Sequence, residues 1–201
     1  PHLRFSYERE SPRTETFRKQ AADFFGYAVP EKMPHPSLVV SEEDRVWARA
    51  ELKNFPPDST VMGIVVGGKS GLKHYHHWEK VIQALSRHDS SVRIILLGGR
   101  QAAKEAAEIT QHFPPDTVMD CTGNNLRAMF ALLSVVDVCI GVDSGPINAA
   151  LAIGTKVVSI FSIIDPQFIL HPEGRGVREI VHPCSRDGGA RCHPENSGRK
   201  C

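Results

Sequence analysis

The sequence has no apolar run long enough to cross a bilayer, no internal repeat and no marked excess of either charge, with a formal net charge of +1. This balance, with ordinary apolar content, argues against a disordered chain and against a nucleic-acid partner. Its 201 residues suit one large domain, or a domain with an arm, and can bury a core. An initiator Met and the features of a signal peptide are also missing, so we expect a piece of a longer protein.

Closely spaced cysteine pairs are missing as well. Cys121 and Cys139 lie in apolar surroundings, which predicts small, buried core residues. Cys184, Cys192 and Cys201 lie in a polar, glycine-rich tail, and the gaps between them are wider than those of the CxxC pairs that mark zinc sites. We therefore favour free thiols over a metal site in this tail, and leave the metal site open.

From residue 61 onward, short apolar runs alternate with amphipathic helical patterns. This alternation predicts βαβ units with right-handed crossovers, and so an α/β fold with a Rossmann-like, doubly wound parallel sheet. The predicted strands are 61–66, 92–97, 117–119, 138–141, 156–161 and 177–182. The predicted helices are 78–87, 101–112, 126–135 and one that ends at residue 153.

The first sixty residues have a different character. They contain a helical pattern over 14–26, a proline-rich connector, and a second helix that begins at Ser41 and ends near residue 54. Ser41 followed three residues later by Asp44 resembles a capping box. We interpret 1–60 as a linker with leading helices and 61–201 as the Rossmann-like domain.

Ligands of such sheets bind at the carboxyl ends of the strands. Two familiar phosphate-binding patterns, the Walker A motif and the dinucleotide fingerprint, are not supported there. The segment 63–70 matches the Walker A expression, but Ile64-Val65-Val66 is typical of the strand itself and Gly71 is a poor helix residue. A P-loop is therefore disfavoured. The dinucleotide fingerprint is absent, since Arg100 and Gln101 follow the glycine pair that ends the second strand, which disfavours a nicotinamide or flavin enzyme.

A third pattern, Asp143-Ser144-Gly145-Pro146, follows a predicted strand and opens a helix. Ser144 can cap the helix or donate its hydroxyl to a phosphate, Gly145 allows close approach to the backbone, and Pro146 suits the first turn. The helix N-terminus attracts anions. Asp143 would repel a phosphate, so we expect it to bind sugar hydroxyls or to fix the loop. Taken alone, the tetrad favours a capped helix without a ligand over a ligand site.

The order of these features resembles the carboxy-terminal domain of the bacterial heptosyltransferases, the ADP-heptose:lipopolysaccharide glycosyltransferases of family nine, which have the GT-B fold. The resemblance covers roughly residues 60–201 and includes a cysteine-bearing tail. The matching pieces, in order, are Lys73 followed by Trp78, Leu96-Leu97-Gly98-Gly99, Gly123-Asn124-Asn125-Leu126, Asp137, Gly141 through Pro146, Ala149 through Gly154, Phe161 and Asp165-Pro166.

The resemblance implies a donor site for an ADP-sugar, with ADP-heptose as the expected donor. Lys73 would neutralise the diphosphate as charge develops on it, and the backbone near Gly98 would hold the adenine. Glu105 corresponds to an acidic residue that contacts the nucleotide ribose. Where the family has His, this chain has Asn148, which cannot carry a charge, so another sugar is an option. The full donor-binding set is Lys69, Ser70, Lys73, Gly98, Asp143, Ser144, Gly145 and Asn148.

The resemblance also limits what this chain can do. The family's catalytic base is an Asp of the amino-terminal domain, which binds the glycolipid acceptor and which residues 1–60 are too short to supply. We therefore expect no catalytic residue here and no activity of the fragment alone. The whole enzyme would act by direct displacement in lipopolysaccharide core or related glycan synthesis. Its expected location is cytoplasmic, with peripheral attachment to the inner membrane as an option.

No cofactor or metal is required for this chemistry, and a Mg²⁺ carried by the donor is allowed but not expected. His74, His76 and His77 lie together without an acidic or cysteine ligand at fixed spacing, which favours a polar donor loop over a metal site. Two other functions stay open. One is a non-catalytic nucleotide-binding Rossmann domain. The other, less favoured, is a P-loop phosphotransferase that uses Lys69 and Ser70.

Overall fold

The computed structural model describes residues 13–28, 36–67, 74–161 and 177–181. The chain forms two compact units, and the sheet lies in the second, which comprises Ser37–Phe161 and Arg175–Ile180. Helix α1 (Arg13–Phe25) belongs to the first unit and confirms the predicted helix 14–26. It exposes several aromatic side chains, and its Phe24 and Phe25 rings meet edge to face at 4.9 Å.

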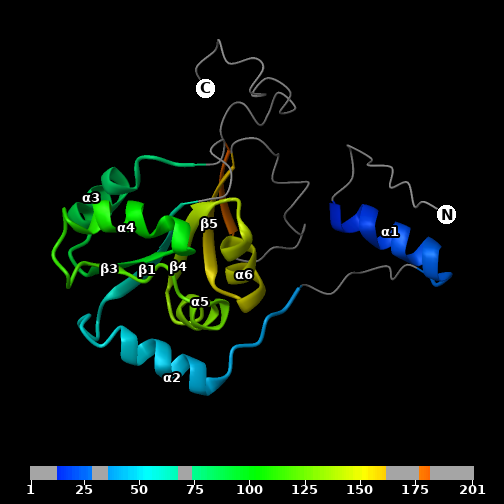
Figure 1. Cartoon of the computed structure of the whole chain (residues 1–201), viewed down its shortest axis with the longest axis horizontal. Helices are drawn as coiled ribbons and strands as arrows, with labels where there is room; N and C mark the ends of the chain where they lie inside the picture. The colour runs from blue at the N-terminus through cyan, green and yellow to red at the C-terminus, as the bar shows by residue number, and fades with distance from the viewer. Residues whose placement is uncertain (1–12, 29–35, 68–73, 162–176, 182–201) are drawn as a thin grey trace, which may run out of the picture. The chain divides into compact units, whose positions relative to one another are not determined.

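The sheet of the second unit has six strands in the order β3-β2-β1-β4-β5-β6 (Figure 1). The pairs β1–β2, β1–β4, β2–β3 and β4–β5 are all parallel, which confirms the predicted Rossmann-like sheet. The strands are β1 (Thr60–Val65), β2 (Val92–Leu97), β3 (Val118–Asp120), β4 (Val138–Val142), β5 (Lys156–Phe161) and β6 (Val177–Val181).

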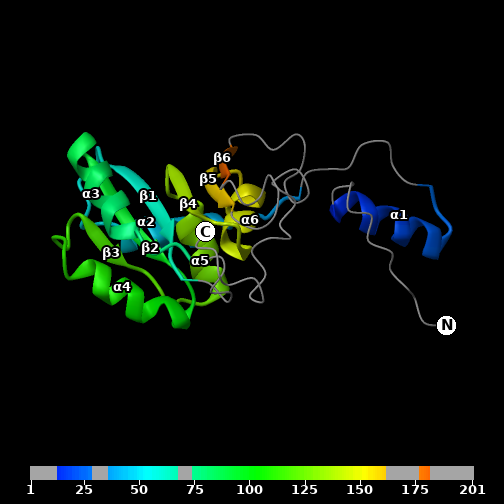
Figure 2. The ribbon, with the colours of Figure 1, turned by 90° about the horizontal axis from the view of Figure 1, so that it is seen from above.

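Successive residues of a strand point to opposite faces of the sheet. Because these strands are apolar at successive positions, both faces are apolar and both are covered by helices. On one face, Val65 and Ile95 pack with α2 (Glu42–Glu51), α5 (Leu126–Leu133) and α6 (Gly145–Ile153). On the other, Ile64 and Ile94 pack with α3 (Trp78–His88) and α4 (Ala103–Thr110). Figure 1 shows α3 and α4 above the strands with α2 and α5 below, and Figure 2 views the molecule from the α3–α4 side.

The predicted helix 101–112 is shorter and begins differently. A 3₁₀ turn, η2 (Arg100–Ala102), precedes α4, and the Ala102 amide donates to the Gly99 carbonyl at 2.9 Å. The tighter turn places Ala102 against the ends of β1 and β2, as its close approach to Gly67 and Gly98 shows. The sequence could not predict this, because the turn depends on what the neighbouring strand ends present.

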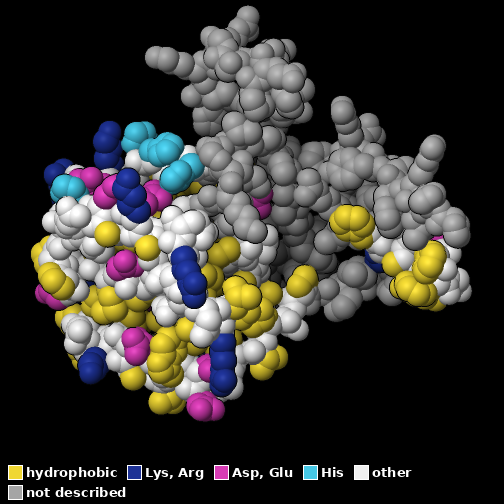
Figure 3. All heavy atoms as spheres, viewed as in Figure 1, with side chains coloured by type: hydrophobic (Ala, Val, Ile, Leu, Met, Phe, Trp, Pro, Cys, Tyr) yellow, Lys and Arg dark blue, Asp and Glu magenta, His cyan; other side chains and the backbone are white. Residues whose placement is uncertain are grey.

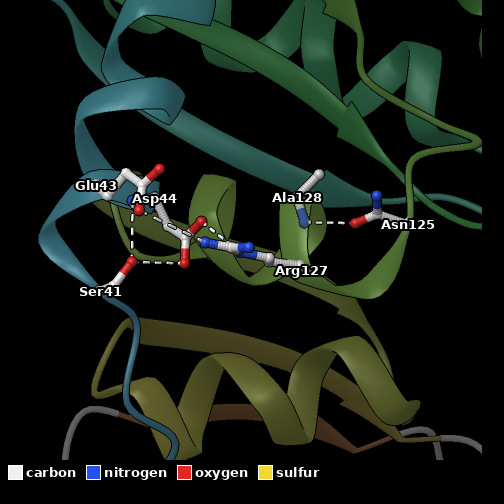
Figure 4. Close-up of polar contacts among 6 residues, drawn as sticks. All are labelled: Ser41, Glu43, Asp44, Asn125, Arg127 and Ala128. Carbon is white, nitrogen blue, oxygen red and sulfur yellow. Dashed lines mark hydrogen bonds and ion pairs between the residues drawn. The ribbon is translucent and has the colours of Figure 1, made fainter.

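Helix α2 lies within the same compact unit as the sheet and packs on α5. Its first turn confirms Ser41 as the predicted cap, since the Asp44 amide donates to Ser41 Oγ at 3.1 Å, while the Ser41 hydroxyl, rather than its amide, donates to the Asp44 carboxylate at 2.7 Å (Figure 4). Arg127 of α5 donates to Asp44 Oδ1 at 2.7 Å. The Ser41 hydroxyl and the Arg127 guanidinium together hold the pKa of Asp44 below its ordinary value of 3.8. The domain boundary at residue 60 stays a prediction.

Several family-like residues turn out to serve the fold. Asp137, which directly precedes β4, accepts a hydrogen bond from the Val61 amide at 2.8 Å and so joins the starts of β4 and β1. Asn125 caps α5 by accepting from the Ala128 amide at 2.9 Å (Figure 4). The first contact lies where β1 and β4 begin, and the second closes the first turn of α5.

Cys121 and Cys139 are buried and unpaired, which confirms them as core residues. Burial raises the pKa of each thiol to about 12, so neither is a ready nucleophile at neutral pH. The three other cysteines lie outside the described residues. None of the described helices is long and apolar enough to span a bilayer.

Candidate functional site

The chain runs from β1 outward to β2 and β3, then returns to β4 on the other side of β1. The carboxyl ends of β1 and β4 therefore flank the topological switch point, where open α/β sheets bind ligands. A cavity of about 700 Å³ lies here, which we call the switch-point cavity. It is lined by Val65, Val66, Gly67, Gly98, Gly99, Gln101, Leu126, Met129, Phe130, Val142, Asp143, Ser144, Gly145, Pro146 and Ala149.

Four of the predicted site residues, Gly98, Asp143, Ser144 and Gly145, thus come together in one cavity. The last three lie between the end of β4 and the start of α6, with Pro146 in the first helical turn. The first turn of a helix leaves amide groups without intrahelical partners, and the helix dipole adds partial positive charge there. This end of the cavity is therefore suited to an anion.

Ser144 occupies the N-cap position of α6 with an extended backbone, but its hydroxyl does not cap the helix. Of the two roles that the sequence allowed for this hydroxyl, capping the helix is therefore not the one that the structure shows. Its Oγ is buried and has no hydrogen-bond partner among the residues that the structure describes, although the residue lines the cavity. A buried hydroxyl without a partner is costly, so a ligand oxygen in the cavity would satisfy it.

The glycines of the cavity differ in what the fold demands of them. A Cβ on Gly98 would lie 2.8 Å from the Val66 carbonyl oxygen and 2.7 Å from Ala102 Cβ, so packing requires glycine there. A Cβ on Gly145 would meet no atom within 4 Å. Gly145 therefore keeps the cavity open at the helix terminus without any packing need, as expected where a ligand approaches the backbone.

The apolar wall of the cavity comes from α5, through Leu126, Met129 and Phe130. These residues were missed as site residues. They share one helical face, at positions i, i+3 and i+4, and Leu126 is 67% exposed despite its apolar side chain. The sequence pattern predicts the helix 126–135 but does not reveal that part of its apolar face borders a cavity.

The remaining predicted residues are not placed in this cavity. Asn148 is exposed on α6 and does not line it, while its amide donates to the Ser144 carbonyl at 3.1 Å. Lys69, Ser70 and Lys73 lie outside the described residues. Gly63 is an interior residue of β1, which opposes the Walker A interpretation, because a P-loop begins after its strand.

A second cavity of about 670 Å³ lies beside α3 and α4, which we call the histidine cavity. Figure 3 shows histidine side chains gathered with basic and acidic ones over these helices. Among its lining residues, His74 Nε2 lies 2.8 Å from Glu105 Oε2. The lining residues are Gly67, His74, His76, Trp78, Glu79, Gln101, Lys104, Glu105, Glu108, Ile109 and His112. Within the described ranges, no group of three or more potential ligands could hold a metal ion.

The sequence model of glycosyltransferase family 9 (heptosyltransferase) matches residues 3–186. The chain belongs to this family. No curated protein sequence matches it.

Solved structures of similar fold include members of this glycosyltransferase family. ADP-heptose lipopolysaccharide heptosyltransferase II of E. coli is 18% identical with a TM-score of 0.65, over 83% of this chain and 52% of that one. E. coli heptosyltransferase WaaC with ADP is 20% identical with a TM-score of 0.61, over 93% and 52%. A family 9 glycosyltransferase of Veillonella parvula is 14% identical with a TM-score of 0.73, over 90% and 51%. This family 9 chain therefore spans about half the length of these relatives.

Proposed function

We propose that the switch-point cavity binds the nucleotide-sugar donor of a glycosyltransferase, as an ADP-sugar and by preference ADP-heptose. The observation that carries the proposal is the Ser144 hydroxyl, buried without a partner at the start of α6 and beside the switch point. A diphosphate oxygen would satisfy this hydroxyl and meet the helix N-terminus. Two solved structures of one similar protein support the choice of nucleotide, E. coli WaaC with ADP and with ADP-2-deoxy-2-fluoro heptose.

Each residue has a role in this proposal. Ser144 and Gly145 bind the diphosphate through hydroxyl and amide groups, and Asp143 orients the sugar through its hydroxyls. Lys73 neutralises the departing nucleotide, with Lys69 and Ser70 on the same loop. The backbone at Gly98 and the apolar face of α5 hold the adenine. Asn148, exposed on α6, contacts the far side of the sugar only if the donor extends beyond the cavity.

The reaction we infer is displacement at the anomeric carbon by an acceptor hydroxyl of a glycolipid, with the nucleoside diphosphate leaving. The base that takes the acceptor proton, and the acceptor itself, belong to an amino-terminal domain outside this chain. Lys73 and the α6 terminus stabilise the leaving group, so the proposal requires no metal or other cofactor. The whole enzyme acts at the cytoplasmic side in lipopolysaccharide core or related glycan synthesis.

The proposal is tested by calorimetric titration of the 201-residue chain with ADP, ADP-heptose and UDP-, GDP- and CMP-sugars. ADP and ADP-heptose are expected to bind more tightly than the others. Ser144→Ala should weaken ADP binding about tenfold or more, because a hydrogen bond to a charged oxygen is lost.

Ser159→Ala is the matched control. The Ser159 hydroxyl is also buried without a partner, but the residue lies in β5 and does not line the cavity. Its variant should bind ADP as the unchanged chain does. Equal affinity of the Ser144 and Ser159 variants for ADP, or no nucleotide binding by the folded chain, would contradict the proposal. Donor binding without transfer, after an amino-terminal domain is supplied, would favour the non-catalytic alternative.

A further inference from the structure

Polar side chains are rare in the switch-point cavity. Among the described residues that line it, only Gln101, Asp143 and Ser144 have one. Asp143 and Ser144 lie together where β4 meets α6, and the proposed donor site uses both. Gln101 belongs to η2, which follows the glycine pair at the end of β2. It is therefore the one polar side chain of this described lining that the proposed donor site leaves without a role.

The polar side chains lie at the ends of two strands that are not neighbours. The strand order places β1 between β2, which leads to Gln101, and β4, which leads to Ser144. Neighbouring strands are about 4.8 Å apart, so the ends of β2 and β4 are separated by about 10 Å. The proposed site has its diphosphate at the start of α6 and its adenine at Gly98, and the ribose between them requires about this separation. Gln101 therefore lies at the base end of the site.

The side-chain amide of Gln101 lies against Gly99. A Cβ on Gly99 would overlap Gln101 Oε1 and would lie 2.9 Å from Nε2, so the amide occupies the space that a side chain there would need. Gly99 lines the switch-point cavity and not the histidine cavity, whereas Gln101 lines both. The contact with Gly99 thus places the amide end of Gln101 at the switch-point cavity. Because Gln101 is exposed, a ligand can reach this amide.

A primary amide presents a hydrogen-bond acceptor beside a donor, its carbonyl oxygen and its NH₂ group. Adenine presents the complementary pair, because its N6 amino group lies beside an acceptor ring nitrogen. One glutamine can therefore bind adenine through two hydrogen bonds. The apolar face of α5 can pack against any base, but it offers no polar side chain that distinguishes one base from another.

We propose that Gln101 determines the base specificity of the donor site. Its Oε1 accepts a hydrogen bond from the N6 amino group of adenine, and its Nε2 donates one to the adjacent ring nitrogen. Gly99 leaves the room in which this amide lies. The inference rests on the proposed donor site and adds to it the residue that selects the nucleotide.

The test is calorimetric titration of the 201-residue chain and its Gln101→Ala variant with two ligands. One is ADP, and the other is purine riboside 5′-diphosphate, which is ADP without the N6 amino group. Gln101→Ala should weaken ADP binding about three- to tenfold, as expected for lost hydrogen bonds between neutral groups. The loss should be smaller for the analogue, because one of the two bonds is already missing. Only groups that touch are coupled in this way.

Gln101→Glu tests the direction of the specificity. A carboxylate only accepts hydrogen bonds, which suits the N1–H and N2 amino groups of guanine and opposes the acceptor nitrogens of adenine. The ratio of ADP affinity to GDP affinity should therefore fall about tenfold or more. Both nucleotides carry the same diphosphate, so the ratio cancels its repulsion by the new charge.

Gln111→Ala is the matched control. Gln111 is an exposed glutamine at the other end of α4, and it lines neither cavity. Its variant should bind ADP as the unchanged chain does. Gly99→Ala should weaken ADP binding with little change in melting temperature, because the new Cβ displaces only the end of a flexible side chain.

ADP binding that Gln101→Ala does not weaken would overturn the inference and leave the donor site standing. The same holds if Gln101→Ala weakens the binding of ADP and of the analogue equally, or if Gln101→Glu leaves the ratio of ADP to GDP affinity unchanged. Failure of the unchanged chain to bind ADP would overturn both proposals. Thermal melting of each variant shows that the proteins compared are folded.

Discussion

The switch-point cavity and the histidine cavity are of similar size, about 700 and 670 Å³, but they are built differently. The first is made of strand ends, glycines and the apolar face of α5, with few titratable side chains. The second is lined mainly by histidine, glutamate and lysine. Backbone amides at a helix N-terminus can bind an anion without any charged side chain. Charged side chains that pair with one another mainly fix the helices and loops that carry them. Gly67, which follows β1, and Gln101 of η2 line both cavities, so the two cavities meet at these residues.

The largest expected effect on stability is at the histidine cavity. Trp78 lines it, is 2% exposed and packs on the β1–β2 face. Trp78→Ala should destabilise the fold by about 3–5 kcal/mol, the usual cost of an aromatic cavity. Chemical denaturation measures this. A loss below about 1 kcal/mol would show that this cavity is not tied to the core as the structure indicates.

Two glycines of the switch-point cavity separate folding from binding. Gly98→Ala should cost about 1–3 kcal/mol of stability, because its Cβ would lie 2.7 Å from Ala102 Cβ. Gly145→Ala should leave stability within about 0.5 kcal/mol and weaken ADP binding instead. Thermal melting and calorimetry on both variants test this division. Equal melting temperatures for the two variants would contradict it.

A smaller effect of the opposite sign is expected at Ser144. Its buried hydroxyl has no partner, so Ser144→Ala should raise stability by up to about 1 kcal/mol in the absence of ligand. With saturating ADP the unchanged chain should gain more stability than the variant. Denaturation with and without ADP measures both. A destabilised variant without ligand would indicate that the hydroxyl serves the fold.

The smallest effect concerns the exposed contact that ties α2 to α5, the helix that forms the apolar wall of the switch-point cavity. The pKa of Asp44 is lowered in the folded chain by Ser41 and Arg127, so the charged form stabilises the fold at pH values above 3.8. Asp44→Asn should therefore melt slightly below the unchanged chain at pH 7, and the difference should shrink as the pH falls below 3.8. A difference that is constant with pH would exclude this ion pair as the cause.

Much of the fold followed from local patterns. The strands 92–97 and 156–161 were predicted with the bounds that the structure shows, because buried parallel strands are continuous apolar runs between turn residues. The Asp143-Ser144-Gly145-Pro146 turn was also placed correctly, after a strand and at the start of a helix. The cap of α2 at Ser41 depends on residues three apart, and was equally accessible.

What local patterns could not supply were contacts between distant segments. The sequence left open whether the Ser144 hydroxyl caps α6 or binds a ligand, and among the described residues it has no hydrogen-bond partner. The α5 face with Met129 and Phe130 was not predicted as part of a site, although it borders the cavity. The His74–Glu105 contact joins residues that are 31 positions apart, and no sequence pattern predicts it.

The sequence by itself determined the α/β class, the strand and helix order, and a family resemblance that the match to residues 3–186 confirmed. These rest on periodicity and on motifs whose residues are neighbours along the chain. Only the tertiary structure decided that β1 and β4 lie side by side, and that Gly98, Ser144 and α5 enclose one cavity. The physical reason is that strand order and side-chain packing depend on burial shared between distant segments, which no local pattern encodes.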